Sequence, residues 1–490
     1  MARRPSAGRS DRALRKCLTG ISGFDEITQG GLPAGRPSLV CGGAGSGKTL
    51  FGMEFLVRGI RQFGEPGVFM SFEETEPDLI TNVASLGFDV DDLVAKGQLA
   101  FDYVHIERSE IEETGEFNLE GLFVRLGAMI QAVGARRVVL DTIEALFSGL
   151  PNEAVLRAEL RRLFRWLREQ GVTTVVTGEQ GRNTLTRYGI EEYVSDCVIL
   201  LDHRVTNQVA TRRLRIVKYR GSSHGTNEYP TLITESGLSV LPITSLGLSY
   251  PVSTGRVSTG VDKLDAMLGG KGYHRGSSVL VSGTAGTGKT SLAASFVDRQ
   301  CRAGKRCVYF SFEESGDQII RNLRSIGFEL DHWRQKGLLT FHTVRPTYHG
   351  LEMHLATMHR LVEQVGPSGV VVDPVSSIIA AGEEASARAM LTRLIDFLKV
   401  REVTALFVSL SLAGGEDTLL GISSLMDTWL QVRVQESDGE RNRLLYVLKS
   451  RGTAHSNQVR EFRLGATGID LIDVYVGPGV VLTGSARLQQ

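Results

Sequence analysis

The same phosphate-binding pattern occurs twice in this chain. Residues 42–49 and 283–290 both match G-x-x-x-x-G-K-[ST] at every fixed position. In such a loop the glycines let backbone N–H groups surround phosphate oxygens, the lysine reaches the β- and γ-phosphates, and the last hydroxyl is a ligand for Mg²⁺. Each copy follows an apolar segment, residues 38–41 or 279–282, and opens a segment of helical character. This context predicts two nucleoside-triphosphate sites, each within an α/β fold.

The nucleotide-binding residues expected in the first copy are Gly43, Ala44, Gly45, Ser46, Gly47, Lys48, Thr49 and Leu50. Those expected in the second copy are Thr284, Ala285, Gly286, Thr287, Gly288, Lys289, Thr290 and Ser291. ATP and Mg²⁺ are the predicted cofactors, with Thr49, Thr290 and Glu313 as the predicted magnesium ligands.

Length and composition fit two domains. The chain has 490 residues, a length that exceeds what one hydrophobic core usually serves, and 42% of the residues are hydrophobic. Lysine plus arginine and aspartate plus glutamate number 55 each, so charge supports neither a nucleic-acid coat nor a membrane-surface protein. Five scattered cysteines indicate reduced thiols and a cytoplasmic location. No apolar run approaches the roughly 18 residues of a membrane span, and no secretory signal is recognised.

The repeat extends along both halves. Residues 19–31 resemble residues 259–270, and 218–221 resemble 449–452. We expect a disordered lead-in at 1–16, a first domain at 17–245, a linker at 246–257, a second domain at 258–478 and a short tail at 479–490. Strands that are apolar throughout alternate with amphipathic helices such as 154–170, which predicts in each half a mostly parallel sheet covered on both faces.

Carboxylates follow two strands in each half. Glu73 and Glu74, and likewise Glu313 and Glu314, end one apolar strand, whereas Asp141 and Asp373 end another in the Walker B pattern. Ligands of such sheets lie beyond the carboxyl ends of the strands. Adjacent residues of a strand point to opposite faces, so one glutamate of each pair would face the γ-phosphate as a base and the other would assist. A solvated helix N-terminus is the alternative for either pair.

Two cationic pairs close the halves. Lys218 with Arg220, and Lys449 with Arg451, have the period-2 spacing of one strand face. A solvated basic edge is one interpretation. The other is a clamp on the phosphates of a nucleotide bound to a neighbouring subunit, as an arginine finger supplied in trans.

Over residues 19–473 the chain resembles the KaiC family, the duplicated RecA-like ATPases of the circadian clock. The motifs that carry the resemblance are residues 191–196, 218–224 and 228–230 in the first half and 422–428, 443, 449–452 and 460–462 in the second. The resemblance implies two tandem RecA-like P-loop domains and a double-ring homohexamer that binds ATP between subunits. It implies hydrolysis in the first ring and autophosphorylation in the second. It also implies nucleotide contacts from Lys218, Tyr219, Arg220, Ser222, His224, Arg443, Lys449, Ser450 and Arg451.

The family's phosphorylated pair falls on Ser423 and Ser424, and a further family threonine falls on Thr418. By themselves the two serines would be an ordinary polar turn. Ser424 replaces the usual threonine, and Pro374 follows Asp373 where the family commonly has serine. The short tail makes a KaiA-type contact unexpected, while a KaiB-type partner of the first ring stays open.

The leading hypothesis is therefore a hexameric ATPase and Ser/Thr autokinase in clock or clock-like signalling. The alternative is a signalling ATPase whose nucleotide state switches partner binding without phosphate transfer. A DNA motor is disfavoured by the neutral charge and the lack of a clustered basic loop.

Overall fold

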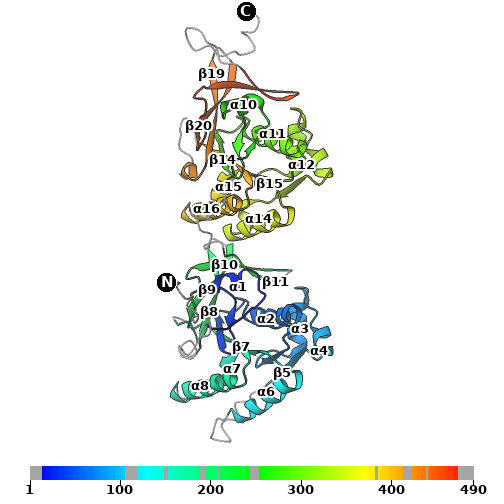
Figure 1. Ribbon diagram of the computed structural model, residues 1–490, viewed down its shortest axis with the longest axis vertical. Coiled ribbons are helices and arrows are strands. Elements are labelled where there is room, and N and C mark those ends of the chain that lie inside the picture. Colours follow the sequence, from blue (N-terminus) through cyan, green and yellow to red (C-terminus); the bar gives the residue numbers. More distant parts are fainter. Residues whose placement is uncertain are drawn as a thin grey trace, which may run out of the picture. The chain divides into compact units, whose positions relative to one another are not determined.

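The computed structural model describes residues 14–104, 119–147, 153–181, 184–186, 189, 195–206, 209–235, 237–242, 253–380, 384–411, 422–437 and 440–472. The chain forms two compact units, Met1–Ser245 and Leu246–Gln490. Figure 1 shows a twisted sheet with flanking helices in each unit.

The described part of the first unit contains a nine-stranded sheet in the order β11-β10-β9-β8-β3-β7-β6-β4-β5. The strands from β8 to β5 in this order pair in parallel, whereas β9, β10 and β11 add an antiparallel extension. Their bounds are β3 Pro37–Gly42, β4 Gly67–Ser71, β5 Leu99–Tyr103, β6 Arg137–Asp141, β7 Thr173–Glu179, β8 Cys197–Thr206, β9 Val209–Tyr219, β10 Glu228–Thr234 and β11 Gly237–Val240.

Helices cover both faces of this sheet because its central strands are apolar on both sides. Val40 and Val139 lie in one hydrophobic cluster with Phe51, whereas their neighbours Leu39 and Val138 lie in another with residues of α6 and α8. The helices are α1 Phe24–Ile27, α2 Lys48–Phe63, α3 Glu76–Ala84, α4 Val90–Ala95, α6 Glu120–Val133, α7 Ile143–Phe147 and α8 Glu153–Glu169.

The second unit repeats this topology. Its described residues form a nine-stranded sheet in the order β16-β15-β17-β18-β14-β19-β20-β21-β22. The bounds are β14 Ser278–Gly283, β15 Cys307–Ser311, β16 Leu339–Thr343, β17 Gly369–Asp373, β18 Thr404–Leu410, β19 Thr428–Ser437, β20 Glu440–Ser450, β21 Arg460–Gly465 and β22 Gly468–Leu471. The predicted tandem RecA-like α/β fold, with mostly parallel sheets, is thus confirmed.

The helical elements of the second unit are α10 Asp262–Met267, α11 Lys289–Arg302, α12 Gly316–Arg324, α13 Leu330–Gln335, η1 Pro346–Tyr348, α14 Leu351–Val365, α15 Val375–Ala380, α16 Glu384–Val400 and η2 Ile422–Ser424. Two short strand pairs complete the units: β1 Lys16–Cys17 with β2 Leu32–Pro33, and β12 Arg256–Val257 with β13 Tyr273–His274. Within the described residues, no helix has the length and apolar character needed to cross a membrane.

Candidate active sites

Each phosphate-binding loop joins a central strand to a long helix. The first loop leads from β3 into α2, and the second leads from β14 into α11. Gly47 and Gly288 cap the helices with φ of 100° and 96°, a left-handed conformation that only glycine adopts at low cost. Each helix begins at the loop lysine, so its unpaired N–H groups face the loop, an arrangement that favours phosphate.

The outer side of each loop is open. A Cβ atom built on Gly43, Gly45 or Gly286 would meet nothing within 4 Å. Lys48 Nζ donates to the carbonyl oxygens of Gly42 and Gly43 at 2.8 and 3.0 Å, and Lys289 Nζ donates to Thr284 O at 2.6 Å. Both ammonium groups therefore lie against their own loops, beside the space that phosphates would occupy.

The other loop residues have local roles. Thr287 Oγ1 donates to Thr284 O at 2.9 Å, which braces the second loop. Ser46 is buried at the corresponding place, whereas Ala44 and Ala285 lie at the loop tips. Leu50 and Ser291 belong to the first helical turns, and Leu50 packs against the hydrophobic core.

A threonine and a Walker B aspartate meet in each unit. Thr49 Oγ1 donates to Asp141 Oδ2 at 2.9 Å, and Thr290 Oγ1 donates to Asp373 Oδ2 at 2.9 Å. Burial raises the pKa of both carboxyl groups, and these hydrogen bonds oppose that rise. The peptide bond after each aspartate, to Thr142 or Pro374, is cis.

This donor set fits Mg²⁺, which prefers oxygen ligands. Among the described residues no group of three or more His, Cys, Asp and Glu side chains is arranged to hold a metal. Sites that hold Mg²⁺ with nucleotide typically use one or two protein oxygens and complete the shell with phosphates and water. A magnesium ion at Thr49 or Thr290 would neutralise phosphate charge when bound.

The glutamate pairs lie in turns, not on strands. β4 ends at Ser71 and β15 at Ser311, two residues before each pair, so the expectation that the pairs end the strands is wrong. The side chains nevertheless diverge. Glu73 accepts from Thr142 Oγ1 at 3.0 Å, next to the Walker B strand, whereas Glu74 accepts from Asn82 Nδ2 of α3 at 3.0 Å.

The second unit repeats this division. Glu313 Oε1 accepts from Ser377 Oγ of α15 at 2.5 Å, and Glu314 accepts from Asn322 Nδ2 at 3.3 Å. Burial lowers the pKa of Lys289 to about 8, while the nearby carboxylates of Asp373 and Glu313 oppose that shift. The lysine and both carboxylates are therefore close together. Sequence reasoning missed Thr142 and Ser377, whose only signal was a hydroxyl shortly after each Walker B aspartate.

The cationic pair of the second unit holds the predicted phosphorylation segment. Lys449 Nζ donates to Ser423 O at 2.9 Å, and Arg451 Nη2 donates to Ser424 O at 2.8 Å. Ser423 is half-buried and Ser424 is exposed. Both cations thus reach the same short helix, η2, although β20 ends at Ser450, before Arg451.

Asp427 anchors this cluster to the central strand. Its carboxylate accepts from the backbone N–H of Ser278 at 2.9 Å and pairs with Lys399 Nζ at 2.8 Å. The first unit has the equivalent arrangement around Asp196, which pairs with Arg168 at 2.5 Å, Arg36 at 3.7 Å and Arg220 at 3.8 Å. Lys218 lies beside it on β9, opposite Val198 at the start of β8.

In each sheet these clusters lie at the amino-terminal ends of the parallel strands, and the phosphate-binding loops lie at the carboxyl-terminal ends. Asp427 contacts Ser278, the first residue of β14, whereas the loop begins at Gly283, the last. Five residues of strand span about 16 Å. The structure therefore separates Ser423, Ser424 and the cations from the phosphate-binding loop of the same unit.

The other predicted nucleotide-contacting residues do not all lie near a phosphate-binding loop. Arg443 pairs with Val434 on β19, beyond the residue opposite Gly283, so it lies toward the loop edge. Tyr219 is buried, and its hydroxyl donates to Gly31 O at 2.7 Å. The His224 ring lies 6.2 Å from that of Tyr219, Ser222 Oγ donates to Ser223 O, and Ser450 Oγ lies 3.2 Å from Thr428 Oγ1. Thr418, residues 191–194 and the tail at 479–490 lie outside the described residues.

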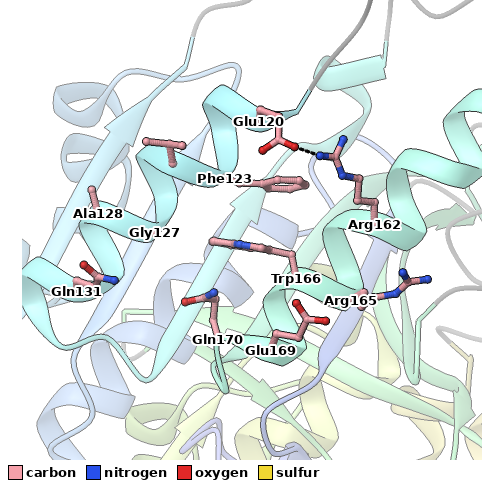
Figure 2. Close-up of a pocket in the computed structure, with 11 residues that line it drawn as sticks. Glu120, Phe123, Gly127, Ala128, Gln131, Arg162, Arg165, Trp166, Glu169 and Gln170 are labelled. Atoms are coloured by element: carbon pink, nitrogen blue, oxygen red, sulfur yellow. Dashed lines mark hydrogen bonds and ion pairs between the residues drawn. The ribbon is translucent and has the colours of Figure 1, made fainter.

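A groove of about 740 Å³ runs between α6 and α8 of the first unit. Figure 2 shows Phe123 and Trp166 facing each other within it, with ring centroids 5.2 Å apart and an ion pair between Glu120 and Arg162 above them. None of the predicted nucleotide-binding residues lines this groove.

Comparison with known proteins agrees with this geometry. The family model described as "ATPase: KaiC" matches residues 17–245 and 257–474. Circadian clock protein KaiC2 of Synechocystis sp. is 56% identical over 484 residues, which cover 98% of this chain and 85% of the relative. Circadian clock oscillator protein KaiC of Synechococcus elongatus is 36% identical, with coverage of 98% and 93%. The protein of that name from Parathermosynechococcus lividus is also 36% identical, with coverage of 97% and 88%.

Proposed function

Because the chain belongs to the KaiC family of ATPases, we propose that it is a homohexameric ATPase and Ser/Thr autokinase. In this proposal the first unit hydrolyses ATP and the second unit transfers phosphate to Ser423 and Ser424 of the same protein. A role in clock or clock-like signalling, with a KaiB-type partner of the first unit, belongs to the same proposal because relatives carry clock names.

Both units would hold Mg-ATP through equivalent groups. Lys48 and Lys289 would contact the β- and γ-phosphates, and Thr49 and Thr290 would provide ligands for Mg²⁺. The metal would neutralise phosphate charge. Glu73 would accept the proton of the attacking water in the first unit, because its carboxylate accepts a hydrogen bond from Thr142, the residue that follows the Walker B aspartate.

The observation that carries the proposal is the distance between two groups of residues in the second unit. The phosphate-binding loop lies at one end of the central strand, and the two serines with their cations lie at the other end. Lys449 and Arg451 bind the carbonyls of Ser423 and Ser424 at the edge opposite the loop. A distance of about 16 Å along the strand is too long for these side chains to reach the γ-phosphate held by their own loop. A neighbouring subunit that presents its loop edge to this cluster would bring serines, cations and γ-phosphate together.

The chemistry then requires few further groups. A serine Oγ would attack the γ-phosphorus, the bond between the β–γ bridging oxygen and that phosphorus would break, and ADP would leave. The hydroxyl proton would pass to Glu313, which Ser377 orients. Lys289, Lys449 and Arg451 would stabilise the charge on the transferring group.

Phosphosite mapping after incubation with Mg-ATP tests this proposal. We expect phosphate on Ser423 and Ser424, and we expect Ser423→Ala/Ser424→Ala to incorporate none while it still binds ATP and hydrolyses it in the first unit. Glu313→Gln is a second test variant: it keeps both acceptors but removes the proposed base, so it should also incorporate little phosphate. If the unsubstituted protein hydrolyses ATP but incorporates no phosphate, the autokinase is contradicted and the nucleotide-switched signalling ATPase takes its place.

A further inference from the structure

The two Walker B aspartates differ in their second hydrogen-bond donor. Asp141 Oδ1 accepts from Thr177 Oγ1 of β7, while its other oxygen accepts from Thr49. Asp373 has no such threonine beside it. Its second donor is Tyr309 Oη of β15, which lies 2.5 Å from Oδ2, the oxygen that also accepts from Thr290.

The sheet registers show that this difference is a reciprocal exchange. Thr177 lies opposite Val40 of β3, and its counterpart Val408 lies opposite Val281 of β14. Phe69 lies opposite Val139 of the Walker B strand, and its counterpart Tyr309 lies opposite Val371. Each unit therefore has one hydroxyl and one apolar side chain at these two positions, on opposite sides of the aspartate.

The burial of Tyr309 explains why its hydroxyl bonds to Asp373. Tyr309 is fully buried, with its ring packed 5.3 Å from that of Phe341. A buried phenol needs a hydrogen-bond partner, and a buried carboxylate needs donors to remain ionised. Both of the donors described for the Asp373 side chain bond to Oδ2.

We propose that Tyr309 is the positioning residue of the second nucleotide site, where its hydroxyl fixes the rotation of the Asp373 carboxylate and so sets the affinity of that site for Mg²⁺. This inference rests on the proposed role of Asp373 in nucleotide binding. It assigns the same task to different strands in the two units: β7 through Thr177 in the first, and β15 through Tyr309 in the second.

The test measures Mg²⁺-dependent binding of a fluorescent ATP analogue to the full chain in a Lys48→Ala background, which silences the first loop. Tyr309→Phe removes one oxygen and keeps the ring in the core. We expect it to raise the Mg²⁺ concentration for half-maximal binding about tenfold or more, the usual consequence of losing a group that orients a metal ligand. Adding Val408→Thr restores a hydroxyl in the manner of the first unit and should return that concentration toward the starting value.

An unchanged Mg²⁺ requirement in Tyr309→Phe would overturn the inference. So would a raised requirement that Val408→Thr does not reverse, because the effect would then come from packing. This readout needs only nucleotide binding, so it decides the role of Tyr309 even if no phosphate reaches Ser423 or Ser424. Complete absence of Mg²⁺-dependent binding in the Lys48→Ala protein would contradict both this inference and the proposed second site.

Discussion

At the scale of single residues, each candidate base depends on a hydroxyl from the segment after the Walker B strand. Thr142 Oγ1 bonds to Glu73, and Ser377 Oγ bonds to Glu313. The adjacent glutamates turn toward asparagines of α3 and α12. The first glutamate of each pair is therefore held by the segment after the Walker B strand, and the second is held by the helix that follows the turn. The charges of Glu74 and Glu314 also act on Asp141 and Asp373.

Glu73→Gln tests this assignment. A neutral amide cannot accept the proton of water, so steady-state ATP hydrolysis should fall roughly 100-fold or more while phosphate incorporation in the second unit stays possible. Glu74→Gln is the matched control and should have a smaller effect, because Glu74 bonds to α3. Hydrolysis that persists in Glu73→Gln and disappears in Glu313→Gln would reverse the assignment of the two units.

At the scale of elements, Asp427 of the second unit connects the central strand, a covering helix and the strand that follows. Asp427 bonds to Ser278 of β14 and Lys399 of α16, and it precedes β19. Burial raises the pKa of Asp427, but the bonds from Lys399 and Ser278 outweigh that effect and hold it below the usual value. The carboxylate therefore stabilises the fold in its ionised form.

Asp427→Ala should lower the free energy of unfolding of the second unit by about 2 kcal/mol at pH 7, a value below that of a fully buried pair because both side chains are partly exposed. A depressed folded pKa contributes stability above the unfolded value and loses it as pH falls through the folded value. The difference in free energy of unfolding between the unsubstituted protein and Asp427→Ala should thus be constant from about pH 7 to pH 5 and shrink below about pH 4.

Urea unfolding across this pH range measures that difference. Asp470→Ala is the control, since the pair of Lys263 and Asp470 is exposed and 3.6 Å long and should contribute almost nothing. Equal stability of Asp427→Ala and the unsubstituted protein at pH 7 would show that the aspartate does not hold these elements together.

At the scale of the whole molecule, the cationic clusters of both units lie away from the loops of their own sheets. In the first unit, Arg220 pairs with Asp196 just before β8 begins. The neighbouring parallel strand β3 ends at Gly42, where the loop begins, so the loop lies at the opposite end of these strands. The proposed phosphate clamp requires another chain to supply the nucleotide, which a ring with closed symmetry would provide.

Light scattering in saturating Mg-ATP should therefore give about six times the 53.4 kDa of one chain. Lys449→Ala/Arg451→Ala should weaken assembly or its dependence on ATP, since it removes the groups proposed to meet the neighbour's phosphates. A protein that stays strictly monomeric under saturating Mg-ATP would contradict the proposed ring.

The sequence alone was sufficient for the family and the fold, and both predictions are confirmed. The loops at Lys48 and Lys289 combine glycine conformations, a lysine and a hydroxyl that only phosphate binding requires together, so local chemistry carries the signal. The strands that are apolar throughout likewise indicate a sheet covered on both faces, since a strand with one solvent-exposed face would alternate apolar and polar residues.

Only the tertiary structure decided how these residues meet. Glu73 and Glu74 diverge because a turn begins after Ser71, which the apolar pattern of the strand did not reveal. The exchange of Thr177 and Phe69 for Val408 and Tyr309 involves strands that are distant in sequence but flank one aspartate in the sheet. Sequence reports what each residue can do, whereas strand order and register, which arise from long-range pairing, determine which partner each residue has.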